Sequence, residues 1–221
     1  MKKRICFIFI LFLCLLSSSV FAASTNSLSI NSDACILVED STGDILFEKN
    51  SKEKMYPAST TKVLTALLVL EKGNLIDTVT ISNTAVSSLS GGYVTPYISA
   101  GEELTVEQLL NVLLIPSGNV AGNALAEYVS GSIDNFCVLM NSRAKELGCV
   151  NSHFTNPYGL HNENHYSCAY DIGMICRQLM TYEFARDWFT AWQEDIKVGL
   201  PGKEKDFTLT NTNKMLRTYR G

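Results

Sequence analysis

The sequence lacks the features that mark several large classes of protein. It has no excess of basic residues, because 18 Lys and Arg stand against 22 Asp and Glu for a formal net charge of −4. An acidic balance without a basic, aromatic-interleaved patch makes nucleic-acid binding a poor reading. No two cysteines have the Cys-x-x-Cys spacing of a metal or redox site. Internal repeats and low-complexity tracts are also absent from the sequence.

The longest apolar stretch of the chain lies at its N-terminus. Three basic residues precede an uncharged apolar stretch over residues 5–16, and small residues follow at Val20 and Ala22. This order is typical of a secretory signal peptide, here residues 1–22 with cleavage after Ala22. An uncleaved membrane anchor is the alternative, but the apolar stretch is short for a spanning helix.

Cleavage would leave residues 23–221, and we expect this mature chain to be exported to the outer face of the cytoplasmic membrane or beyond the cell. The removed segment carries three basic residues and no acidic one, so 15 basic residues would face 22 acidic ones. The remaining length is enough for one domain with a real core. The odd number of remaining cysteines favours mostly free, buried thiols over a disulfide framework. They are Cys35, Cys137, Cys149, Cys168 and Cys176.

Hydrophobic periodicity and turn residues predict a mixture of strands and helices. The predicted strands are 34–38, its hairpin partner 45–48, then 78–81 and 207–210. The predicted helices are 59–73, 105–115 (opened by a capping box at Thr105), 120–129, 132–147, 169–180 and 183–192, with a Ser- and Gly-rich loop at 87–101. The pattern is that of an α+β protein whose sheet is unfinished.

Ser59 and Lys62 form the most informative pattern in the chain. A serine and a lysine three residues apart lie on one face of a helix, and the apolar run from Val63 predicts that this helix is buried. Burial and the positive helix N-terminus both lower a lysine pKa, so that the neutral amine can take a serine proton. The same N-terminus offers a backbone N–H to a developing oxyanion. The plain alternative is that Ser59 is an ordinary helix N-cap.

A second Ser-x-x-Lys pattern serves as a comparison within the chain. Ser51 and Lys54 have the same spacing, but they lie in a charged stretch with no apolar helix behind it. We interpret this copy as a solvated loop.

Ser117 and Asn119 form a second pattern, Ser-Gly-Asn, behind Pro116 and between two predicted helices. A hydroxyl and an amide at such a junction could project into a cleft. The alternative is a helix-breaking turn in which Asn119 is the N-cap of the next helix.

Together the two patterns resemble those of the penicillin-recognising serine enzymes. Four segments are similar to the low-molecular-mass D-alanyl-D-alanine carboxypeptidases of serine peptidase family S11, and the resemblance runs from about residue 32 to 221. The segments are residues 57–62 (PASTTK), 117–121 (SGNVA), 153–160 (HFTNPYGL) and 211–216 (NTNKML). The resemblance implies a β-lactamase/transpeptidase-like fold with a helical subdomain.

The resemblance also implies roles for the named residues. Ser59 would attack the carbonyl of the penultimate D-alanine of a peptidoglycan stem peptide, and Lys62 would take its proton. Ser117 would relay a proton to the leaving D-alanine, and Asn119 would bind the substrate amide or hold Lys62. β-Lactams would acylate the same serine, and no metal or organic cofactor is implied.

One element of the family is missing from residues 1–221, namely the Lys-Thr-Gly strand that binds the substrate carboxylate. We therefore expect residues 23–221 to be an incomplete catalytic domain, poorly soluble and nearly inactive alone. Membrane association would come only through a C-terminal region that these residues do not include.

Two other functions stay open on the sequence. A class A β-lactamase needs a carboxylate that activates the deacylating water, and Glu163 has the wrong surroundings for it. A truncated, non-catalytic wall protein that at most binds stem peptides is the other reading. The histidines His153, His161 and His165 flank one loop, where ordinary loop polarity explains them better than a metal site.

Overall fold

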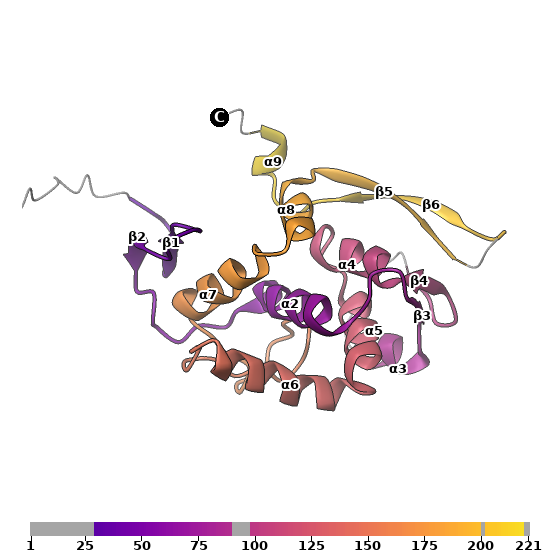
Figure 1. Cartoon of the computed structure of the whole chain (residues 1–221), viewed down its shortest axis with the longest axis horizontal. Coiled ribbons are helices and arrows are strands. Elements are labelled where there is room, and N and C mark those ends of the chain that lie inside the picture. The colour runs from indigo at the N-terminus through magenta and orange to yellow at the C-terminus, as the bar shows by residue number, and fades with distance from the viewer. Residues whose placement is uncertain (1–28, 90–97, 200–201, 219–221) are drawn as a thin grey trace, which may run out of the picture. The chain divides into compact units, whose positions relative to one another are not determined.

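Helix α2 (Lys62–Lys72) lies at the centre of the structure because its sequence is apolar on every side. Every residue from Lys62 to Val69 is buried, which is typical of a helix enclosed by other helices. Four helices pack against it, as Figure 1 shows for the computed structural model. They are α4 (Val106–Leu114), α5 (Asn119–Ser130), α6 (Ile133–Glu146) and α7 (Ala169–Leu179).

The structure describes residues 29–89, 98–199 and 202–218. The chain divides into two units between Ser32 and Asp33, and all helices and strands described here belong to the second unit. The predicted signal peptide, residues 1–22, and the Gly91–Gly92–Tyr93 part of the predicted loop lie outside the described residues. In the described part of the chain, no helix combines the length and apolarity that crossing a membrane requires.

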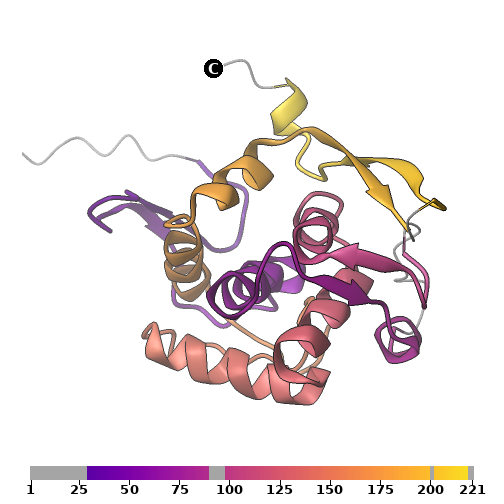
Figure 2. The same ribbon diagram turned by 45° about the vertical axis from the view of Figure 1, so that its right-hand side comes forward.

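The strands of the described residues form three antiparallel pairs rather than one continuous sheet. The pairs are β1 (Cys35–Val38) with β2 (Ile45–Lys49), β3 (Thr78–Thr80) with β4 (Glu103–Thr105), and β5 (Gln193–Val198) with β6 (Lys205–Thr210). The first pair packs on α7, where a Cβ on Gly173 would lie 2.9 Å from Ile36 Cγ2. Figure 2 shows the third pair beside α4. Gln108 on α4 joins the two by donating its side-chain N–H to Lys197 O on β5.

Local sequence signals fix several of these boundaries. Thr105 and Gln108 form the predicted capping box at the start of α4, because each side chain accepts a hydrogen bond from the other residue's backbone N–H. Ser132 caps α6, and α5 ends at Gly131 with a φ of 77°. Short helices complete the set: η1 (Ala58–Thr61), α3 (Asn83–Ser87), α8 (Glu183–Thr190) and α9 (Met215–Thr218).

Most elements predicted from periodicity are confirmed, and the two missed strands, β4 and β5, were missed for different reasons. The predicted helix 183–192 ends at Thr190, and strand β5 follows unpredicted. In β5 only Ile196 and Val198 are buried, and the exposed polar and charged side chains at the other positions hide the alternation. Strands β3 and β4 have three residues each, and β4 was missed because its last residue also caps α4.

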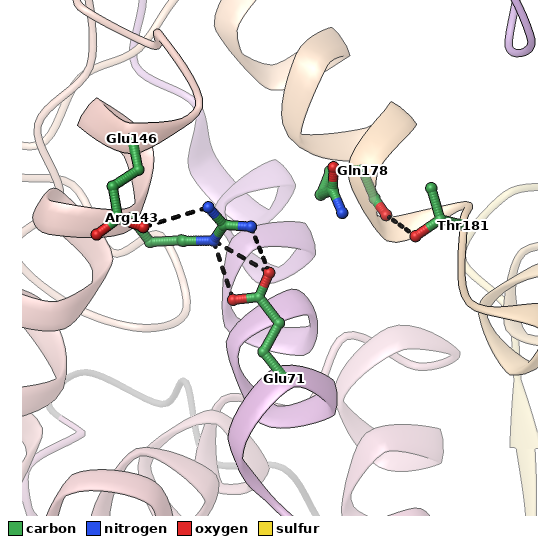
Figure 3. A network of polar contacts seen from close by, with 5 residues as sticks. All are labelled: Glu71, Arg143, Glu146, Gln178 and Thr181. Atoms are coloured by element: carbon green, nitrogen blue, oxygen red, sulfur yellow. Dashed lines mark hydrogen bonds and ion pairs between the residues drawn. The ribbon is translucent and has the colours of Figure 1, made fainter.

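An ion pair joins the end of α2 to α6, as Figure 3 shows. Arg143 donates from Nε to both carboxylate oxygens of Glu71 at 3.0 Å, and from Nη2 to Oε1 at 2.6 Å. The Arg143 and Glu71 side chains are 23% and 17% exposed, whereas Glu146, the second partner, is 59% exposed. This forked, half-buried pair is therefore the stronger of the two.

Replacing Arg143 by Ala should lower the free energy of unfolding by about 1–3 kcal/mol, because it leaves the Glu71 carboxylate half-buried without its partner. Glu146→Gln removes only the exposed Arg143–Glu146 pair and should change the free energy of unfolding by less than about 0.5 kcal/mol. Urea denaturation of both variants measures the difference. Equal losses would show that the Arg143–Glu71 pair does not fasten α2 to α6.

Candidate active site

Ser59 lies in the short helix η1, which leads directly into α2. Its neighbour Ala58 has a φ of 47°, a left-handed conformation that is uncommon for a residue with a Cβ. Pro57 O accepts hydrogen bonds from Thr60 N–H at 3.1 Å and from Thr60 Oγ1 at 2.6 Å, which closes the turn. Ser59 is thereby exposed at the surface while the next helix enters the core.

Lys62 is the first residue of α2 and is 2% exposed. Its Nζ lies 3.1 Å from Ser59 Oγ and 2.8 Å from the backbone oxygen of Tyr158. Burial lowers the pKa of Lys62 from 10.5 to about 8. The amine is therefore neutral in a useful fraction of molecules near pH 7, and its lone pair can then take the proton of the Ser59 hydroxyl.

The loop of residues 153–166 holds this turn from the outside. Asn156 Oδ1 accepts the backbone N–H groups of Tyr158, Gly159 and Leu160, which directs the Tyr158 oxygen to Lys62. Gly159 has a φ of 92°, and a Cβ there would lie 1.8 Å from Ala58 O. Only glycine fits at this point, because the two backbones are in direct contact.

Further contacts extend the same loop along α2. Thr65, one turn after Lys62, donates from Oγ1 to Pro157 O at 2.6 Å. His165, which is 1% exposed, lies with Nε2 at 2.8 Å from Thr61 Oγ1. The loop therefore contacts the start of α2 at successive turns, from Ala58 to Thr65.

Ser117 and Asn119 lie at the junction of α4 and α5, as predicted. Ser117 is half-buried with a φ of 65°, and Gly118 N–H donates to Val112 O at 2.8 Å. The N-cap of α5 is Gly118 and not Asn119, which is the first residue of the helix. One turn later, a Cβ on Gly122 would lie 3.4 Å from Tyr158 Cβ, so the start of α5 abuts the loop that binds Lys62.

The second Ser-x-x-Lys copy has a different structure. Lys54 is exposed, and its Nζ lies 3.9 Å from the centre of the Tyr166 ring. Ser51 is buried, unlike a residue of a fully solvated loop, and donates to Glu48. The interpretation as a loop holds for the lysine, but the serine is a packed turn residue.

Sequence reasoning missed the part played by the 153–166 loop. The Asn-Pro-x-Gly run over residues 156–159 is turn chemistry and agrees with the loop predicted here, but no local signal places that loop against residue 58. His165 was predicted as ordinary loop polarity, whereas it is buried; His153 and His161 are exposed, as predicted. Glu163 is exposed on the same loop.

Two other features of the described residues bear on the site. An apolar hollow of about 790 Å³ lies between β1 and α7, but Ser59, Lys62 and Ser117 are not among its lining residues. Within the described ranges, no group of three or more His, Cys, Asp and Glu side chains is placed to hold a metal ion.

The fold, together with an exposed Ser59 hydroxyl beside the buried Lys62 amine, indicates one class, the DD-peptidases. The structure is similar to that of the Streptomyces K15 DD-transpeptidase, with a TM-score of 0.81 and 28% identity over 87% of this chain and 78% of that one. It is also similar to the D-alanyl-D-alanine carboxypeptidase DacD from Francisella tularensis, with a TM-score of 0.75 and 25% identity over 88% and 58%. The predicted α+β fold of the β-lactamase/transpeptidase type is therefore confirmed.

Sequence comparison gives the family. Residues 20–220 match the model of Peptidase_S11, described as D-alanyl-D-alanine carboxypeptidase. The chain is 38% identical over 202 residues to the D-alanyl-D-alanine carboxypeptidase DacF of Bacillus subtilis, which covers 89% of this chain and 50% of DacF. It is 35% identical over 180 residues to DacC of Escherichia coli, which covers 76% and 45%. The chain belongs to this family, and it spans about half the length of these two relatives.

Gly159→Ala should destabilise the protein more than Gly148→Ala. Both glycines have positive φ, 92° and 78°, but nothing lies within 4 Å of a Cβ on Gly148. Gly148→Ala should cost about 1 kcal/mol of unfolding free energy from backbone strain alone. Gly159→Ala should cost about 1–3 kcal/mol more, because the new methyl group pushes the loop away from Ala58.

Chemical denaturation of the two variants measures this difference. Equal costs would mean that the loop does not press on the turn that carries Ser59.

Proposed function

We propose that this chain carries the acylation machinery of a serine D-Ala-D-Ala carboxypeptidase that acts on peptidoglycan stem peptides. The observation that carries the proposal is the Lys62 amine, buried and 3.1 Å from the exposed Ser59 hydroxyl, in a chain of this family. Residues 23–221 would then be part of the catalytic domain.

In the proposed reaction, neutral Lys62 Nζ takes the Ser59 proton as Oγ attacks the carbonyl of the penultimate D-alanine. The tetrahedral intermediate carries its negative charge near the N-terminus of α2, which favours an anion there. Collapse breaks the peptide bond, leaves an ester on Ser59 and releases the terminal D-alanine after its nitrogen gains a proton. Water then hydrolyses the ester, and Ser59 regains its proton.

Ser117 and Asn119 are proposed to serve the leaving group and the substrate. Ser117 would pass the proton from Lys62 to the departing nitrogen, and Asn119 would hydrogen-bond the substrate amide or hold Lys62. These two roles are supported by the position of both residues at the α4–α5 junction. There the start of α5 contacts the 153–166 loop, whose Tyr158 O also binds Lys62.

The cellular setting follows from the same proposal. Peptidoglycan lies outside the cytoplasmic membrane, which agrees with a signal peptide at residues 1–22 and with export of the mature chain. A β-lactam presents a reactive carbonyl to the same serine and would form a stable ester. Support for this reading over a class A β-lactamase comes from the family match and the named relatives.

Penicillin labelling tests the proposal. Prolonged incubation of the 221-residue chain with fluorescent penicillin should give one long-lived adduct, on the peptide that contains Ser59. Ser59→Ala should abolish the adduct, whereas Ser51→Ala, in the second Ser-x-x-Lys pattern, should leave it unchanged. Mass spectrometry of the peptides locates the ester.

The labelling rate should also rise with pH. Below the Lys62 pKa of about 8, the neutral amine increases about tenfold per pH unit, so the rate should climb from pH 6 and level off above about 8. Steady release of hydrolysed penicillin would favour the β-lactamase reading. No adduct on Ser59 would contradict the proposal and favour the non-catalytic wall protein.

A further inference from the structure

His165 is a buried histidine whose hydrogen bonds define its tautomer. The backbone N–H of Thr155 donates to Nδ1 at 3.0 Å, and Thr155 Oγ1 and Asn156 Nδ2 lie 3.3 and 3.4 Å from the same nitrogen. Because the backbone N–H of Thr155 can only donate, Nδ1 carries its lone pair, and the ring proton is on Nε2. Burial, with the charges of His153 and His161, lowers the pKa of His165 to about 4, so the ring is neutral at pH 7.

The Nε2 proton points at the segment that carries the proposed nucleophile and base. Thr61 Oγ1 lies 2.8 Å from Nε2 and accepts this proton. Thr61 is the last residue of η1 and the N-cap of α2, between Ser59 and Lys62. It is completely buried, so its hydroxyl cannot exchange His165 for bulk water.

The contact between His165 and Thr61 joins the 153–166 loop to the turn through two side chains. Gly159 and Tyr158 also contact this segment, but from the loop's side they do so only through backbone atoms, Gly159 against Ala58 O and Tyr158 O to Lys62 Nζ. If the His165 contact were lost, Thr61 could change rotamer, and Lys62 directly after it could shift against Tyr158 O. A shift of about 1 Å between a base and a nucleophile can cost about a hundredfold in rate.

We propose that His165 is a positioning residue: by donating to Thr61 it fixes the turn on which Ser59 and Lys62 meet. The proposal rests on the proposed function of that pair. His165 does not act as a base, because its Nδ1 lone pair is taken by Thr155 and its Nε2 proton by Thr61. Phe154 packs edge-on against the ring with centroids 5.6 Å apart, which holds the imidazole plane.

Substitutions at both ends of the contact test the proposal. Thr61→Val keeps the shape but removes the acceptor, and should lower the penicillin acylation rate constant about 10–100-fold with little change in the dissociation constant of the noncovalent complex. Thr61→Ser restores a hydroxyl and should keep most of the rate. His165→Phe should behave like Thr61→Val, and His165→Gln, which keeps a donor near Nε2, should lose less.

The matched control is His153→Phe. His153 is on the same loop and hydrogen-bonds Asn164 O through Nδ1 at 2.6 Å, but no contact joins it to residues 58–62 in the described structure. Its acylation rate should be unchanged. Rates are compared per folded molecule, with folding followed by circular dichroism, so that simple instability is not counted.

An activity-independent measurement separates this proposal from the proposed function. If the parent chain forms no adduct, the proposed function fails. The positioning role can still be tested, because the NMR chemical shift of Lys62 ¹³Cε reports the surroundings of the Lys62 amine. That signal should move in Thr61→Val and stay in Thr61→Ser and in His153→Phe. Acylation rates and Lys62 signals that are the same in Thr61→Val as in the parent would overturn the positioning role.

Discussion

The contact between the Lys62 amine, the Ser59 hydroxyl and the Tyr158 backbone oxygen is the interaction on which the rest of the structure depends. Burying a charged lysine is costly, and the protein relieves the cost by favouring the neutral form. That burial requires α2 to be enclosed on all sides, which four packed helices accomplish. The apolar core and the chemistry of the site therefore depend on each other, since a looser core would admit water and raise the pKa of Lys62 towards its ordinary value of 10.5.

Positive backbone φ angles occur beside Ser59 and at Ser117, the two serines of the proposed site. Among the described residues, three that are not glycine have positive φ: Asn50, Ala58 and Ser117. Asparagine tolerates this conformation, but alanine and serine do so at a cost. Ala58 precedes the proposed nucleophile and is held by direct backbone contact with Gly159. Ser117 turns the chain between α4 and α5, and Gly122 on α5 lies against the same loop. The contact with Gly159 holds Ala58, and the hydrogen bond from Gly118 N–H to Val112 O holds the turn at Ser117.

The sequence predicted what depends on neighbouring residues and missed what depends on distant ones. The Ser59–Lys62 spacing, the Thr105 capping box and the β1–β2 hairpin are local patterns, and each is present in the structure. The contact of His165 with Thr61 joins residues 104 positions apart, and no periodicity or turn signal encodes it. Strand β5 was missed because its exposed positions are polar or charged, although Ile196 and Val198 alternate as a strand requires. The catalytic roles came from the family resemblance, because spacing alone does not assign them.

The central claim is that burial converts Lys62 into a base for Ser59, and a direct titration of its amine tests it. The chain is labelled with ¹³Cε-lysine, the Lys62 signal is assigned by its loss in Lys62→Arg, and its chemical shift is followed with pH. The account predicts a titration midpoint of about 8. A midpoint near the ordinary lysine value of 10.5 would mean that burial does not lower the pKa of Lys62 and that almost no neutral amine exists near pH 7, and the account of the site would be wrong.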